Sequence, residues 1–120
     1  IVKATLQSIA FQTFDLIVCM EKDSRKKMTE LRVDGGMINN HRFIQLLADI
    51  LQIKIVCTKN IETTALGAAY LAGISSRILN DTKDIEMLWK FSSKFKPKEL
   101  KKTRNAMVKN WHNIIFKLIK

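Results

Sequence analysis

The clearest periodic pattern of apolar residues lies between positions 38 and 51. Phe43, Leu46, Leu47, Ile50 and Leu51 follow the i, i+3, i+4, i+7, i+8 spacing of an amphipathic helix. Short apolar runs flank it on both sides, "LRV" at 31–33 and the alternating "IKIVC" at 53–57, and each predicts a strand. A strand, a helix and a strand of these lengths favour a parallel βαβ unit.

The segments outside this unit predict helices. Residues 1–21 contain no glycine or proline and are apolar on more than one side, which predicts a largely buried helix. Residues 63–74 begin with threonines able to cap a helix and carry rows of small residues that favour an interior position. Residues 81–91 predict a helix capped by an aspartate, and a last helix follows a break at Phe95 and Pro97.

This order of elements predicts an α/β fold that is rich in helices. Two strands make a poor sheet, because parallel sheets favour more strands with both faces covered. We therefore expect the chain to be one piece of a larger protein, an expectation that the first residue, Ile1, also favours.

Composition is consistent with one modest domain, since 47% of the 120 residues are apolar. No apolar run approaches the roughly 20 residues of a membrane span. Cys19 and Cys57 show no metal-binding spacing and are expected to be buried free thiols of a cytoplasmic protein. Most of the net charge of +10 lies in residues 90–120. A lysine-rich chain has such a solvated surface without any ligand, although a basic nucleic-acid-binding module is the alternative.

The chemistry most worth considering lies at "DGG", residues 34–36, where a strand ends in glycines just before a helix. Glycines let the backbone approach a ligand, and a helix N-terminus offers free N–H groups to an anion. Asn39 and Asn40 fall near the first turn and could cap the helix or reach a ligand. The pattern is neither G-x-G-x-x-G nor a P-loop. On these residues alone, a purely structural turn and a nucleotide contact both stay open.

Other candidates for chemistry are sparse. Asp34 stands where catalytic and metal-binding acids occur, but it could equally make a local Asx hydrogen bond. His41 and His112 have no partner at metal-binding spacing, and Asp49 and Glu62 have no evident partner. Trp89 and Trp111 suit helix packing better than base stacking. We expect no catalytic residue and no metal site in this chain.

A family resemblance changes this picture. "LRVDGGMINNHRFIQLLADILQIKIV" followed by "ETTALGAAYLAG" resembles the glycerol kinases of the FGGY family of sugar and polyol kinases. "ATLQSIAFQTFDL" and "FKPKELKKTRNAMVKNW" are similar to segments of the same kinases, so the resemblance covers nearly all of residues 1–120. It implies part of the C-terminal lobe of an actin-like (ribonuclease-H-like) ATPase fold. Residues 1–120 would be a C-terminal fragment of the second, nucleotide-binding domain, with 81–120 as a helical C-terminal extension.

The resemblance also implies roles for residues. Gly36 and Asn40 match positions that contact ATP or ADP in the family, whereas Asp34 and Gly35 are weaker candidates. Thr63, Thr64 and Gly67 match a motif expected to pack behind the nucleotide.

The activity implied is phosphoryl transfer from ATP to the alcohol group of glycerol. The general base, the ligands of Mg²⁺ and the glycerol pocket are expected outside this chain, so the isolated chain is expected to be inactive. A complete enzyme is expected to be a cytoplasmic homo-oligomer. A kinase of the same family that acts on another polyol is the main alternative.

Overall fold

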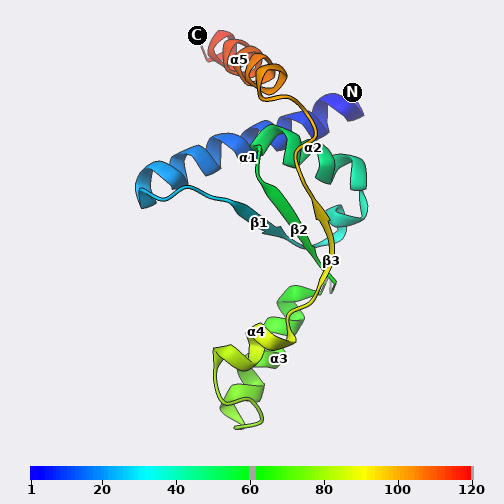
Figure 1. Cartoon of the computed structure of the whole chain (residues 1–120), viewed down its shortest axis with the longest axis vertical. Coiled ribbons are helices and arrows are strands. Elements are labelled where there is room, and N and C mark those ends of the chain that lie inside the picture. Colours follow the sequence, from blue (N-terminus) through cyan, green and yellow to red (C-terminus); the bar gives the residue numbers. More distant parts are fainter. Residues whose placement is uncertain (60–61, 120) are drawn as a thin grey trace.

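The computed structural model describes residues 1–59 and 62–119, and Figure 1 shows how their elements are arranged. Both expected strands and the helix expected at 63–74 are present within one residue of their expected bounds, whereas the other expected helices differ by three residues at one end. The elements in chain order are α1 (Val2–Ser24), β1 (Glu30–Val33), the 3₁₀ helix η1 (Gly36–Asn39), α2 (His41–Leu51), β2 (Lys54–Thr58), α3 (Thr63–Ser75), α4 (Thr82–Leu88), β3 (Phe91–Phe95) and α5 (Lys101–Leu118).

The sheet has three strands in the order β1-β2-β3. β1 and β2 are parallel, with Leu31 opposite Ile55, which confirms the predicted parallel pair. β3 runs antiparallel to β2 and was not expected, because residues 81–91 were predicted to be one helix within a helical C-terminal extension, 81–120. The helix α4 ends at Leu88, and the chain then pairs along the free edge of β2. Edge pairing satisfies backbone groups that helix propensity alone does not take into account.

The core lies between β2 and the apolar face of α2. Ile44, Ala48 and Ile50 of α2 and Ile55 and Cys57 of β2 are each at most 1% exposed. α1 crosses the same side of the sheet (Figure 1) and adds Ala10, Phe11 and Ile17. The expectation that α1 is largely buried is wrong, since these are its only buried residues and Leu16 is 60% exposed.

α3 and α4 project from the end of the sheet (Figure 1), and neither helix contains a buried residue. The prediction of an interior position for α3 is therefore wrong for this chain. Its row of small residues is used only locally, since a Cβ added at Gly73 would lie 3.1 Å from the side chain of Leu79. What stays exposed is a largely apolar helix, with Leu71 70% exposed.

α5 is attached to α1 and α2 by a few specific contacts. The ring of Trp111 stacks on Phe11 with centroids 5.4 Å apart, and its Nε1 donates to Asp15 at 2.9 Å. The segment before α5 is held by Asp49 of α2, whose Oδ1 accepts hydrogen bonds from the backbone N–H groups of Lys98 at 2.6 Å and Glu99 at 3.1 Å. The expectation that Asp49 has no partner is thus wrong, because it accepts from backbone groups about 50 residues away and from the side-chain amide of Gln45 on its own helix.

The described helices include none that is both long and apolar enough to cross a membrane.

We predict that replacing Ile55 with alanine strongly destabilises the chain. Its side chain is 0% exposed, and cutting such a residue to alanine costs roughly 2–5 kcal/mol through lost burial and the cavity left behind. Ile78→Ala is the matched control, because Ile78 is 80% exposed. Urea unfolding of both variants would measure the free energies, and equal losses would contradict this account of the core.

We also predict that Asp49→Ala loosens α5. The carboxylate accepts two backbone N–H groups, and hydrogen bonds to a charged group are worth about 1.5–3 kcal/mol each. The amides of Lys98 and Glu99 should lose protection from hydrogen exchange. Asp23→Ala, at an exposed position at the end of α1, should change stability by no more than about 0.5 kcal/mol. Unchanged exchange at Lys98 and Glu99 in the Asp49 variant would refute the role given to Asp49.

Candidate functional site

The turn from Asp34 to Asn40 joins the end of β1 to the start of α2. Gly35 has φ +81°, a left-handed conformation that favours glycine, so its identity is explained by the backbone. The 3₁₀ helix η1 follows, held by hydrogen bonds from Ile38 N–H to the Gly35 carbonyl and from Asn40 N–H to the Met37 carbonyl. The turn is short and fixed by its own backbone.

Gly36 has no such explanation within the chain. Its φ lies outside the left-handed region, and a Cβ built on it would meet nothing within 4 Å. Gly36 is also exposed. Neither backbone strain nor crowding therefore requires a glycine here. A ligand that approaches the backbone closely would require one.

Asn40 is the N-cap of α2. Its Oδ1 accepts a hydrogen bond from the backbone N–H of Phe43 at 3.1 Å, which confirms that an asparagine caps this helix. The cap uses the amide oxygen and fixes the plane of the side chain. Because Asn40 is exposed, its Nδ2 group can donate to a molecule beside the helix N-terminus.

Asp34 joins the turn to the next loop. Its Oδ2 accepts a hydrogen bond from the hydroxyl of Thr63, the first residue of α3. The sequence suggested a local Asx bond for Asp34 and a capping role for the threonines. Instead the N-cap of α3 is Glu62, which makes no side-chain cap bond. The hydroxyl of Thr63 donates to Asp34 and so connects the start of α3 to the turn after β1.

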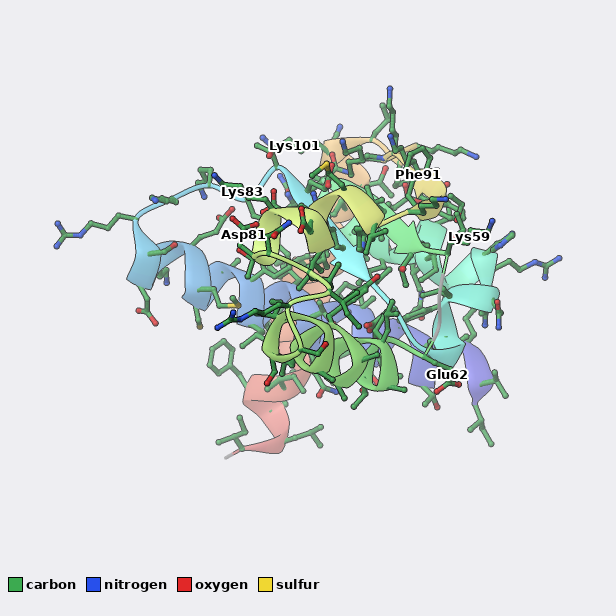
Figure 2. All side chains as sticks on the ribbon, turned by 90° about the horizontal axis from the view of Figure 1, so that it is seen from below. Lys59, Glu62, Asp81, Lys83, Phe91 and Lys101 are labelled. Carbon is green, nitrogen blue, oxygen red and sulfur yellow. The ribbon has the colours of Figure 1, made fainter. Side chains whose placement is uncertain are left out.

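The structure thus brings Asp34, Gly35, Gly36 and Asn40 together at the carboxyl ends of the parallel strands, where ligands of α/β proteins commonly bind. A cavity of about 430 Å³ lies at the same end of β2. Thr58 and Lys59 form its strand side, and residues of α3, the end of α4 and the segment just before β3 form the remainder. Figure 2 looks onto this end of the molecule and labels Lys59, Glu62 and Phe91.

Sequence reasoning did not find this cavity, because it depends on β3. Its lining includes Tyr70 of α3 and Trp89, the residue after α4. The guanidinium of Arg32 lies 4.4 Å from the centroid of the Trp89 ring, so Trp89 is held against the sheet. The spacing of apolar residues gave no signal for this contact, since Arg32 and Trp89 are far apart in the chain.

Charged side chains occupy the face of the sheet opposite α1 and α2. Glu30 of β1 forms ion pairs with Lys54 of β2 and with Arg32. The hydrogen bond from Lys54 is the main reason that the pKa of the Glu30 carboxyl is lowered. Val56 lies between Arg32 and Lys94 in the register and is 2% exposed. This face is therefore polar around one covered valine.

The remaining candidates are placed away from the turn. His112 lies 2.7 Å from Asp15 (Nε2 to Oδ1), so it has a partner that the sequence did not suggest. Cys57 is buried as expected, but Cys19 is exposed, which corrects the expectation for that thiol. No group of three or more potential metal ligands occurs within 1–59 and 62–119.

Comparison with known proteins gives three informative matches. The chain is 45% identical over 116 residues to glycerol kinase of Trichlorobacter lovleyi, and 40% identical over 115 residues to that of Dechloromonas aromatica. Each alignment covers 96% of this chain and 23% of the relative, so the chain spans about a quarter of the length of these enzymes. The crystal structure of xylulose kinase from Lactobacillus acidophilus superposes with a TM-score of 0.76 over 96% of this chain and 23% of that one, at 21% identity.

These matches confirm the fold expected from the resemblance, with one antiparallel strand added to the predicted parallel pair. Residues 1–76 match the model of the FGGY family of carbohydrate kinases, C-terminal domain. The chain belongs to the FGGY family of carbohydrate kinases.

Proposed function

We propose that this chain is the C-terminal, nucleotide-contacting part of an ATP-dependent glycerol kinase, which converts glycerol and ATP to glycerol 3-phosphate and ADP. The observation that carries the proposal is Gly36, an exposed glycine whose identity neither its φ nor its surroundings require. The glycerol kinases to which the chain is 40–45% identical support glycerol as the substrate.

In the proposed complex, ATP or ADP lies against the turn between β1 and α2. A bare backbone at Gly36 permits close approach, and the Nδ2 of Asn40 donates to the nucleotide. The first N–H groups of α2 add a positive dipole end that suits phosphate. Asp34 and Gly35 act indirectly, because one ties the turn to α3 and the other sets its conformation.

The chemical step requires groups that this chain does not supply. Phosphoryl transfer depends on in-line positioning and on neutralising the charge of the γ-phosphoryl group. Among the described residues no group of three or more potential metal ligands occurs. We therefore assign the Mg²⁺ ligands, the glycerol pocket and the base to the rest of the kinase, and we expect the isolated chain to form no ADP when glycerol is added.

A kinase acting on another polyol is the alternative, because the Asp34–Asn40 turn is proposed to contact the nucleotide and not the polyol that accepts the phosphoryl group. The solved xylulose kinase shares the fold of this chain at 21% identity, so it does not favour xylulose. Activity of the complete protein with a panel of polyols would separate the two, and faster turnover of a pentulose than of glycerol would replace the substrate proposed here.

We predict that Gly36→Ala weakens binding of ATP and ADP while the fold is kept, because the added methyl group meets no atom of the chain but does meet a closely approaching nucleotide. Titrating the labelled chain by NMR should shift the amides of Gly36 and Asn40, with millimolar affinity, and the variant should reduce these shifts. Ser75→Ala is the control, because Ser75 is exposed at the far end of α3 and should leave the nucleotide shifts unchanged.

Gly35→Ala tests the other half of the turn, because φ +81° strains any residue with a Cβ and should lower stability. Equal nucleotide affinity in the native chain and the Gly36 variant, or shifts centred on the lysines of α5, would refute the assignment of the nucleotide site.

A further inference from the structure

The outer edge of β1 is open. In the part of the chain that the structure describes, no strand pairs with β1 on the side away from β2. The carbonyl of Thr29, just before β1, accepts a hydrogen bond from the N–H of the first residue of β2 at 3.4 Å. Backbone groups of alternate residues in a strand point to the same side, so those of Leu31 and Val33 also face β2. The N–H and C=O groups of Glu30 and Arg32 therefore point outward, where a further strand would pair with them.

The side chains of β1 suit a sheet that continues past this edge. Leu31 and Val33 pack against the core but stay half-buried. Both charged side chains of β1 lean away from the open edge, because Lys54 of β2 pairs with one and the ring of Trp89, just before β3, contacts the other. The edge therefore lacks the projecting charges that commonly prevent a strand from pairing with another.

The second uncovered surface belongs to α3. Residues 63–76 include no charged side chain, no residue of α3 is buried, and Leu71 is 70% exposed. Its exposed positions include four alanines that share one side of the helix, which we call the alanine face: Ala65, Ala68, Ala69 and Ala72. Isolated helices of this length are marginal in water, because most helical stability comes from packing. An apolar helix without a cover therefore indicates a missing neighbour.

The total exposed surface indicates how large the missing neighbour is. The chain exposes 9127 Å². A compact monomer of 13.8 kDa exposes roughly 6,600 Å². The excess of about 2,500 Å² is roughly three times the area that each partner buries in an interface of standard size, and it reaches the range of permanent complexes. The chain therefore fits a large, permanent partner.

One partner can cover both surfaces, because they meet at a hydrogen bond. The hydroxyl of Thr63, the first residue of α3, donates to Asp34, the residue after β1. The chain corresponds to 23% of the glycerol kinases that it resembles, so most of such an enzyme lies outside it. A second copy of the chain is disfavoured, since each copy carries a net charge of +10 and the two would repel.

We propose that the remainder of the kinase covers both surfaces. One of its strands pairs along the outer edge of β1, and another of its elements packs on the alanine face, where small side chains permit close approach. This docking surface rests on the proposed function, under which the chain is one part of a larger enzyme. Because α3 is bonded to the Asp34–Asn40 turn, the same contact holds the proposed nucleotide site in place.

The test co-expresses the 120-residue chain with the glycerol kinase of Trichlorobacter lovleyi from which the segment that aligns with this chain has been removed. The two parts should purify together as a complex. Hydrogen exchange should then be slower at the amides of Glu30 and Arg32 and along α3 than in the free chain. The amides of Leu31 and Val33 are the internal reference, because they already face β2.

Two variants test the two surfaces separately. Ala69→Glu should weaken the complex at least tenfold and leave the melting temperature of the free chain unchanged, because Ala69 is exposed. Ala106→Glu, at an exposed position of α5, is the matched control and should not weaken the complex. Arg32→Pro removes an outward N–H without breaking the ladder with β2, so it should also weaken the complex.

The readouts separate this proposal from the proposed function. Slower exchange at both surfaces, with ADP formed when glycerol and ATP are added, supports both. Slower exchange without ADP formation supports the docking surface and counts against the proposed function. The docking surface is overturned if the two parts do not purify together, if Glu30 and Arg32 exchange as fast in the complex as in the free chain, or if Ala69→Glu binds as the native chain does. A dimer of the 120-residue chain that already protects these amides also overturns it, because a second copy would then be the partner.

Discussion

Burial of β2 determines where the other elements lie. Ile55 and Cys57 point toward α2 and are almost fully buried, while the backbone on both sides of the strand is paired, with β1 on one edge and β3 on the other. Neither neighbouring strand buries much by itself, since none of their residues is fully buried. α1 packs on α2, and α5 packs on both helices. A change that displaced β2 would therefore uncouple parts of the chain that do not touch one another.

The sequence predicted this centre well because its signals are local. The spacing of Phe43, Leu47 and Ile50 identifies α2, and the alternation in "IKIVC" identifies β2. Prediction from the sequence failed for segments whose conformation depends on a partner far away in the chain. Residues 91–95 become a strand because the edge of β2 is free, and Asp49 finds its partners in backbone groups about 50 residues later. α3 has the composition of an interior helix, but the described residues do not cover it.

The two adjacent glycines of the candidate site differ in what explains them. Gly35 is required by its own φ, whereas the absence of any neighbour at Gly36 gives that residue a different reason to be small. Sequence alone could not separate the two, because the distinction rests on a dihedral angle and on empty space. The resemblance favoured Gly36 over Gly35 as the proposed nucleotide contact, and of the two only Gly35 has a backbone conformation that explains its identity. The cavity beside Trp89 was beyond reach, since its lining joins the end of β2 to residues of α3 and to the segment after α4.

The place of β3 has a consequence for how the chain is made and divided. The family model ends at residue 76, yet the strand that closes the free edge of β2 begins at Phe91. A nascent chain that has emerged only as far as α3 presents an unpaired edge on its most apolar strand, and such edges pair readily with other chains and lead to aggregation. A boundary drawn at the end of the recognised domain would make that transient state permanent. The unit in which both edges of β2 are paired therefore extends past the family boundary, at least to Phe95.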